Sequence, residues 1–443
     1  MRSYRVRALS WLRAKKSRVG SEHPINHILV VAYLYPPCNV VPAHRPSGLQ
    51  RAFVSAGIRT TVLTSEISGS YEDDEQQGIV RAGDLRTRFL TQYQTLVGYR
   101  DERLAARTKP RWWTKYIVPD PAAVSWFPQA LGQLLRLIRK DRPDVVVTTS
   151  SPETSHLLGL VASAFGIRWV ADYRDPWLRD AEQPAVLRLV NRGLERLVAR
   201  RATVVTAVNH PIAADITRRH GVPTFTISNG FDRAAIADAS DERTSLDRTR
   251  FSLVHTGFLA LDLDEPVLHR GRDARMLLDA LALLLERDPG FAARFELVLA
   301  GPISDAERNP LTRKELRGIV SVLGLMPRER ALGLQQAADG LLLIPGGADA
   351  TTAKVFEYLA ARKPIFAVTE LDSVAAELLG EAGEHTVAEP EDAESLSSAL
   401  SAYVGRWSSA GAAYEPSPGF DLEAYEYESL GRKLLQLLPQ GSG

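Results

Sequence analysis

The chain alternates between short apolar runs and longer stretches in which apolar residues recur every three or four positions. The short runs have the length of buried strands, and the longer stretches are typical of amphipathic helices. In the first half, the pattern predicts strands over 27–35, 60–64, 144–149, 168–173, 203–208 and 223–227, and helices over 49–56, 126–139, 156–165, 184–201 and 212–220. This alternation predicts βαβ units and a parallel sheet. Residues 71–118 lack a clear period, and we interpret them as an insertion or connection of the first domain.

A second series of the same kind follows a polar, charge-rich run over 234–250. It predicts strands over 251–255, 295–300, 320–325, 341–344 and 364–368, and helices over 273–286, 311–318, 328–338, 373–379, 392–404 and 422–438, with one more helix within 349–364. Two such series predict an α/β fold of two doubly wound, Rossmann-like domains that face one another across a cleft. The predicted organisation is a basic tail (1–24), a first domain (25–233), a linker (234–250), a second domain (251–415) and a C-terminal helix (416–443) that packs back on the first domain.

Composition excludes several classes of site and partner. The 443 residues carry a formal net charge of +1, which argues against a nucleic-acid partner. Cys38 is the single cysteine, so no intrachain disulfide can form and a reducing compartment such as the cytoplasm suits the chain. The sequence has no C-x-x-C, no H-E-x-x-H and no apolar run long enough to span a bilayer. No G-x-G-x-x-G follows the first predicted strand, which argues against a nicotinamide-dependent dehydrogenase.

The N-terminal segment departs from this charge balance. Seven Lys and Arg residues lie between Arg2 and Arg18, and the first acid is Glu22. With Trp11 among the bases, the segment can lie on an anionic membrane, which would place the protein at the inner face of the plasma membrane. The alternative is a solvated, disordered tail.

The most informative stretch is Asp349–Pro364, DATTAKVFEYLAARKP, which follows an apolar run and the Pro345–Gly347 turn. A helix that begins near Thr351–Thr352 would offer free backbone N–H groups to a phosphate, with Lys354 in its first turn. Glu357 lies one turn later on the same face, where its carboxylate can accept two hydrogen bonds from the vicinal hydroxyls of a ribose. The alternative is an ordinary buried helix face with a surface ion pair between Lys354 and Glu357.

Asp349, seven intervening residues and Glu357, followed by Leu-Ala-Ala-x-x-Pro, resemble the E-x7-E stretch of retaining glycosyltransferases of family 4. Further landmarks in the family's order are YPP near Tyr35, DYRDPW at Asp172–Trp177, SNGFD at Ser228–Asp232, HTG ending at Gly257 and LAGP at Leu299–Pro302. The resemblance covers residues 27–404 and implies a GT-B fold, with a nucleotide-sugar bound by the second domain and the acceptor by the first. It also implies transfer with retention and without a bound metal, because helix dipoles and basic side chains meet the charge of the departing diphosphate.

The resemblance assigns roles to particular residues. Glu357 would hold the ribose hydroxyls, the main chain near Thr352 the diphosphate, and the main chain at Met326 the base. The implied donor-binding residues are Gly257, Arg270, Arg272, Pro302, Met326, Gly346, Gly347, Thr352, Lys354 and Glu357. Asp349 would face the sugar, although it is one methylene shorter than the usual Glu. The basic side chains that would contact the diphosphate are Lys354 or the arginines at 270, 272 and 275. The alternative for these arginines is that they are the solvated start of a helix.

On the acceptor side, we expect Asp175 to contact or orient the incoming hydroxyl, with Arg174 beside it; the alternative is a buried structural Asp–Arg pair. The predicted catalytic residues are therefore Asp349, Glu357 and Asp175. His44 and Arg45 fall in the first predicted loop, where they can contact donor or acceptor. The D-x-D spacing at 262–264 resembles a metal motif of another glycosyltransferase fold, but we expect no metal, since spaced acids are common in polar loops.

The resemblance therefore implies a hexosyltransferase that uses a UDP- or GDP-sugar and no cofactor, in bacterial polysaccharide or cell-surface glycan synthesis. Its acceptor would be a glycan or lipid-linked glycan, with a small natural product as the second class. Two other functions stay open on the same fold: a sugar-nucleotide 2-epimerase, and a scaffold that has lost transfer activity.

Overall fold

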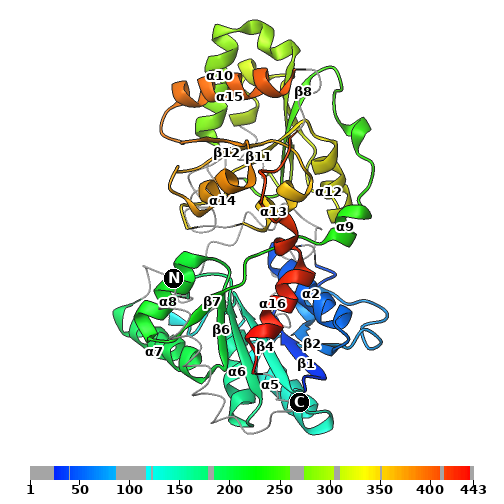
Figure 1. Cartoon of the computed structure of the whole chain (residues 1–443), viewed down its shortest axis with the longest axis vertical. Coiled ribbons are helices and arrows are strands. Elements are labelled where there is room, and N and C mark those ends of the chain that lie inside the picture. Colours follow the sequence, from blue (N-terminus) through cyan, green and yellow to red (C-terminus); the bar gives the residue numbers. More distant parts are fainter. Residues whose placement is uncertain are drawn as a thin grey trace. The chain divides into compact units, whose positions relative to one another are not determined.

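The computed structural model describes residues 24–38, 40–85, 116–120, 123–177, 184–259, 274–303, 310–349, 352–409 and 414–439. The chain divides into two compact units (Figure 1). Unit 1 comprises 1–228 and 427–443, and unit 2 comprises 229–426. The basic tail, Arg270, Arg272 and the D-x-D spacing at 262–264 lie outside the described residues.

In its described residues, unit 1 contains a seven-stranded parallel sheet. Its strands are β1 (His27–Val31), β2 (Arg59–Ser65), β3 (Ile79–Ala82), β4 (Val145–Ser150), β5 (Arg168–Tyr173), β6 (Val204–Ala207) and β7 (Thr224–Thr226). They are ordered β3-β2-β1-β4-β5-β6-β7, and every pairing is parallel. The chain winds outward in both directions from β1 and β4, so the predicted doubly wound sheet is confirmed.

Helices cover both faces of this sheet. One face packs against α5 (Phe127–Lys140), α6 (Thr154–Ala164), α7 (Ala185–Arg201) and α8 (His210–His220). The other packs against α2 (Val41–Ser55) and α16 (Tyr427–Leu437). The central strands are buried on both faces, which explains why they read as nearly continuous apolar runs.

The C-terminal helix α16 lies beside α2 in unit 1, as predicted (Figure 1). Two glycines permit this close packing. A Cβ at Gly48 would lie 2.3 Å from the Tyr427 ring, and one at Gly431 would lie 2.5 Å from the Cβ of Ala52. The predicted continuous helix over 422–438 is wrong, since a 3-10 turn (η7, Leu422–Tyr425) belongs to unit 2 and α16 begins after it.

Unit 2 contains a second parallel sheet, which has six strands in its described residues. They are β8 (Phe251–Thr256), β9 (Phe295–Ala300), β10 (Val320–Val322), β11 (Gly340–Leu343), β12 (Ile365–Val368) and β13 (Thr386–Ala388), in the order β10-β9-β8-β11-β12-β13. One face packs against α10 (Arg275–Arg287) and α15 (Ala393–Trp407), and the other against α12 (Arg328–Ala337), α13 (Ala353–Ala360) and α14 (Val374–Ala382).

Residues 234–250, predicted as the linker, pack on unit 2. A short helix (α9, Arg233–Ala237) and a 3-10 turn (η4, Arg243–Ser245) lie within or beside this run. Leu246 is buried in the core of unit 2, and Glu242 accepts hydrogen bonds from Arg330 on α12 at 2.7 and 2.9 Å. An apolar anchor, an ion pair and further hydrogen bonds, such as that from the Asp247 N–H to Glu296, therefore hold a segment whose composition is otherwise polar.

Three further differences from the sequence-based expectations have local causes. The predicted helix over 311–318 is wrong: only Leu311 in it is α-helical, the 3-10 turn η6 (Lys314–Leu316) follows, and Gly318 adopts φ +79°. The edge strands β3 and β13, which are four and three residues long, were not predicted, and β3 lies in the stretch 71–118 that lacks a clear period. Helix α2 begins at Val41, within the predicted first loop, so His44 and Arg45 are helical residues.

Candidate functional site

Two glycines bring the carboxyl ends of β8 and β9 together in unit 2. The Gly257 N–H donates to the Ala300 carbonyl oxygen at 2.6 Å, and a Cβ at Gly301 would lie 2.0 Å from the Gly257 carbonyl oxygen. Gly257 also has a φ angle of +95°, a backbone conformation that residues with a side chain rarely adopt. No larger residue fits where these two loops meet.

Lys354 extends from the first turn of α13 over Gly257. A Cβ at Gly257 would lie 2.8 Å from the Lys354 Cε and 2.9 Å from its Nζ. The ammonium group lies 3.2 Å from Nε2 of His255, whose Nδ1 lies 2.9 Å from the Leu342 carbonyl oxygen. Nε2 also lies 3.3 Å from the Phe258 carbonyl oxygen. In the tautomer that satisfies the shorter carbonyl contact, Nδ1 carries the imidazole proton and Nε2 accepts from Lys354. This arrangement fixes a positive charge at the start of α13, at the ligand-binding edge of the sheet.

Glu357 lies one turn after Lys354 and is buried. Its Oε1 accepts a hydrogen bond from Nη2 of Arg328 at 2.7 Å. Arg328 opens α12 directly after Met326 and Pro327, so this ion pair links the β10–α12 loop to α13. Arg328 was missed at the sequence level; its position just after a strand-end loop was the available signal.

The β11–α13 loop also contributes predicted residues. Gly346 and Gly347 have φ +102° and +121°, and the Val374 N–H donates to the Ala348 carbonyl oxygen at 2.9 Å, which ties the loop to α14. Asp349 is exposed at the end of this loop. Thr352 occupies the N-cap position of α13, but its hydroxyl does not cap the helix and has no hydrogen-bond partner within the described structure.

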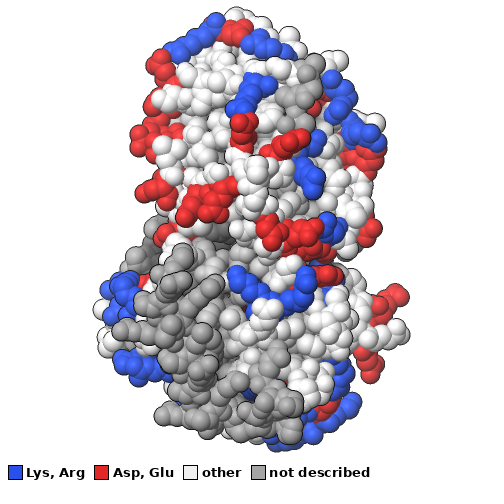
Figure 2. Space-filling view, viewed as in Figure 1, with Lys and Arg blue, Asp and Glu red and all other residues white. Residues whose placement is uncertain are grey.

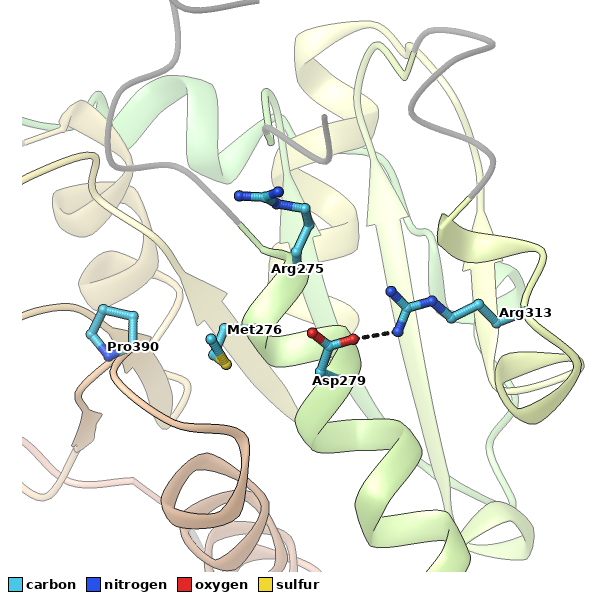
Figure 3. A pocket seen from close by; sticks show the side chains of 5 residues that line it. All are labelled: Arg275, Met276, Asp279, Arg313 and Pro390. Carbon is cyan, nitrogen blue, oxygen red and sulfur yellow. Dashed lines mark hydrogen bonds and ion pairs between the residues drawn. The ribbon is translucent and has the colours of Figure 1, made fainter. Parts of the chain in front are cut away.

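A cavity of about 380 Å³ opens at the start of α10 (Figure 3). It is lined by Arg275, Met276, Asp279, Arg313 and Pro390. Arg313 pairs with Asp279, while the Arg275 guanidinium lies apart from that pair in the close-up view. Of the arginines expected near the diphosphate, Arg275 is the one that the described structure includes.

In unit 1, Arg45 belongs to the core. Its guanidinium forms a bidentate ion pair with Asp172, with both N–O distances 2.8 Å, and also donates to the carbonyl oxygens of Ile227 and Ser228. Asp172 accepts further hydrogen bonds from Thr149 and Thr206. Burial alone would raise the pKa of Asp172, but the adjacent guanidinium holds that pKa below its usual value. The expectation that Arg45 sits in a loop is therefore wrong: it ties α2 to β5 and the end of β7.

Arg174 and Asp175 follow β5 at the carboxyl edge of the sheet. Arg174 donates to the carbonyl oxygens of Pro42, at 2.7 Å, and of Ser150 and Ser151, and burial lowers its pKa. Asp175 is only partly buried and accepts from the Ser151 hydroxyl at 3.2 Å. A buried structural Asp–Arg pair does lie nearby, but it is formed by Arg45 and Asp172, three residues before Asp175. His44, on α2, is also partly exposed.

His156 lies behind this edge and is fully buried. Its Nδ1 lies 2.7 Å from the Thr148 hydroxyl, and its ring stacks on Trp177 with a centroid separation of 5.9 Å. Burial lowers its pKa to about 3, so the imidazole is neutral and inaccessible as a general base. Trp177, the last residue of the DYRDPW landmark, thereby anchors the segment that carries Arg174 and Asp175.

Comparison with known proteins places part of this architecture in a family. Residues 42–230 match the model of the glycosyl transferase 4-like domain. The chain carries a glycosyltransferase 4-like domain. The match falls in unit 1 apart from its last two residues, so the residues predicted to bind the donor in unit 2 lie outside it. No curated protein sequence matches the chain.

Solved structures share the fold over nearly the whole length. Sucrose-phosphate synthase from Thermosynechococcus elongatus is 15% identical, with a TM-score of 0.59, and the match covers 93% of this chain and 94% of that one. HepE from Anabaena, solved with UDP and glucose, is 15% identical, with a TM-score of 0.57 and coverages of 95% and 96%. UDP-GlcNAc 2-epimerase from Methanocaldococcus jannaschii is 13% identical, with a TM-score of 0.52 and coverages of 93% and 99%. The chain thus has the predicted GT-B fold.

Within the described ranges, no group of three or more His, Cys, Asp or Glu side chains is arranged to hold a metal ion. No helix in the same ranges is both long and apolar enough to cross a bilayer.

Proposed function

We propose that the protein is a retaining glycosyltransferase that transfers a hexose from a UDP- or GDP-sugar during polysaccharide or cell-surface glycan synthesis. The observation that carries this proposal is the placement of Lys354 and Glu357 one turn apart on α13, with Lys354 held by His255 and Glu357 held by Arg328. Together they place a cation and a fixed carboxylate at the start of one helix. The cation suits the diphosphate of a nucleoside diphosphate, and the carboxylate suits its ribose.

The diphosphate would bind at the start of α13. Free N–H groups of the first turn and the Lys354 ammonium favour an anion there. The close approach of Gly257 and Gly301 leaves main chain instead of side chains beside that ammonium. As the sugar departs, negative charge builds on the diphosphate, and these fixed donors stabilise it without a metal ion.

The nucleoside would bind at Glu357. The Arg328 hydrogen bond occupies Oε1 at 2.7 Å, so the carboxylate is fixed in orientation and keeps further lone pairs for the two ribose hydroxyls. The base would lie against the main chain near Met326, whose side chain is buried in the core of unit 2. Arg328 is therefore a positioning residue for the ribose carboxylate.

The sugar would face the β11–α13 loop, where Gly346 and Gly347 expose main chain and Asp349 supplies a carboxylate. On the acceptor side, Asp175 would orient the incoming hydroxyl, with His44 nearby and Arg174 fixing the loop through three carbonyl oxygens. The proposed acceptor is a glycan or lipid-linked glycan, and a small natural product is the second class.

A thermal-shift panel of UDP-, GDP-, TDP- and ADP-sugars, with and without Mg²⁺, tests the donor site. A ligand at about a hundred times its dissociation constant adds roughly 2.7 kcal/mol of stability, which raises the unfolding midpoint visibly. We expect a selective, Mg²⁺-independent shift that Glu357→Gln abolishes and Glu286→Gln, an exposed site on α10, leaves intact. If none of the nucleotide-sugars raised the unfolding midpoint, a scaffold role would be favoured instead.

The second candidate is a sugar-nucleotide 2-epimerase, because a 2-epimerase shares this fold over 93% of the chain. Product analysis with donor alone separates the two activities, since epimerisation needs no acceptor. A C2-epimerised nucleotide-sugar formed without acceptor would replace the transferase proposal, whereas sugar transfer that requires an acceptor would support it.

A further inference from the structure

Helix α7 in unit 1 presents an apolar stripe outward. Val186, Leu189, Val190, Gly193 and Leu197 follow one another at spacings of three, one, three and four residues, which places them on one face of the helix. The exposed fractions of the four apolar side chains are 72%, 68%, 46% and 43% in that order. Large apolar side chains at this spacing form a contiguous surface, unlike singly scattered exposed residues.

The stripe is not the core-facing side of the helix. Asn191, Glu195, Val198 and Ala199 form the buried side, where Val198 and Ala199 pack in the core of unit 1. A surface helix of a globular protein normally directs polar residues away from the core. Helix α7 directs apolar residues there instead, so its outward face is built to contact something other than water.

The surroundings of the stripe are strongly basic. All five arginines of α7 are exposed, namely Arg188, Arg192, Arg196, Arg200 and Arg201. The single acid of the helix, Glu195, is buried and bonds Arg219 and His220 of α8. Lys and Arg side chains also gather at the edge of unit 1 where α7 and α8 lie (Figures 1 and 2). The outward face of α7 therefore combines apolar side chains with exposed arginines.

We propose that α7 docks the protein on an anionic lipid bilayer, lying in the plane of the headgroups. An interfacial helix needs an apolar face that enters the acyl boundary and basic side chains that meet lipid phosphates. Arginine serves both needs, because its stem covers apolar surface while its guanidinium stays at the phosphates. This inference concerns a surface of unit 1 and is independent of the glycosyl transfer proposed above.

Flotation of the full-length protein with vesicles tests the inference. The vesicles are phosphatidylcholine alone, or phosphatidylcholine mixed with phosphatidylglycerol. We expect binding only to the anionic vesicles. Val186→Gln/Leu189→Gln/Leu197→Gln changes no charge and should weaken that binding at least about tenfold. Arg192→Gln/Arg196→Gln/Arg200→Gln should weaken it roughly a hundredfold, at about 1 kcal/mol per basic residue.

Matched controls make the test specific to α7. Val54→Gln/Leu371→Gln alters exposed apolar residues elsewhere (51% and 61% exposed), and Arg243→Gln/Arg287→Gln/Arg406→Gln removes three charges from unit 2. Both controls should bind vesicles like the wild type. Failure of the wild type to bind anionic vesicles, or equal binding by the α7 variants, would overturn the inference. So would a lipid-free dimer that the apolar α7 variant converts to a monomer, since the stripe would then cover a second copy.

Discussion

The Nη2 atom of Arg328 lies 2.7 Å from Oε1 of Glu357, so the first residue of α12 fixes a carboxylate on α13. These residues are 29 positions apart in the chain and come from helices that follow different strands of the same sheet. A buried carboxylate with one oxygen held by a guanidinium has a fixed orientation. The ion pair thus gives Glu357 the rigidity that its proposed role, the recognition of a vicinal diol, requires.

We expect Arg328→Gln to raise the KM for the nucleotide-sugar about tenfold or more while changing kcat less, because a lost charged hydrogen bond releases the carboxylate that we propose binds the ribose. Arg328→Lys should recover part of the loss, because it keeps the charge but loses the planar donor. Steady-state kinetics with the donor identified by thermal shift provide the measurement. Arg330→Gln is the matched control, because Arg330 lies on the same helix and pairs with Glu242. An equal KM increase in the control would assign the effect to α12 in general.

The Arg45–Asp172 pair should behave as one unit in the stability of unit 1. Arg45→Met leaves a buried carboxylate without its counter-ion and should lower the free energy of unfolding by about 3–5 kcal/mol. Arg45→Met/Asp172→Asn removes the stranded charge and keeps an acceptor for Thr149 and Thr206, so it should be more stable than the single Arg45 variant. Urea unfolding followed by tryptophan fluorescence measures both. Additive losses in the double variant would show that the two side chains are not coupled.

Gly301→Ala should disturb the meeting point of the two strand-end loops. The new methyl group would lie 2.0 Å from the Gly257 carbonyl oxygen, so backbone must move, at a cost on the order of 2 kcal/mol. The same movement displaces Gly257 from beneath Lys354 and should weaken the thermal shift produced by the donor. Gly380→Ala, on α14, meets no atom within 4 Å and should raise stability by roughly 0.5–1 kcal/mol. A Gly301 variant with wild-type stability and donor binding would contradict the close approach.

The sequence predicts the buried parts of the fold well. Strands β5 and β9 were predicted to the residue, since strands buried on both faces read as apolar runs bounded by polar or turn residues. The start of α2 was missed because Pro42 and Pro46 suggest a loop. Proline is tolerated in the first turn of a helix, and Pro46 lies inside α2, where the pattern gives no sign of it.

Pairings between distant side chains were the harder part of the candidate site. Lys354 and Glu357 were found because their spacing on one helix is visible in the sequence. Arg45 was expected at a ligand, and its true partner, Asp172, lies 127 positions away. Arg328 was overlooked for the same reason. Local periodicity reports which face of an element is buried, but ion pairs between elements depend on strand order, which the sequence does not display.

His156 should make unit 1 sensitive to acid. Burial lowers its pKa to about 3, whereas an unfolded chain protonates the imidazole near 6.5. The unfolded state therefore binds more protons between these values, so the contribution of His156 to stability is complete above about pH 6.5 and is lost as pH falls toward 3. At 1.36 kcal/mol per pKa unit, the contribution is at most on the order of 5 kcal/mol.

Urea unfolding from pH 7 to pH 4 should show a shallower slope of stability against pH in His156→Gln than in wild type. Exposed His210→Gln should keep the wild-type slope. The substitution also removes a ring that packs between Trp169 and Trp177, which lowers stability equally at every pH. Only the slope of stability against pH reports the proton uptake of His156, so the slope is the quantity to compare.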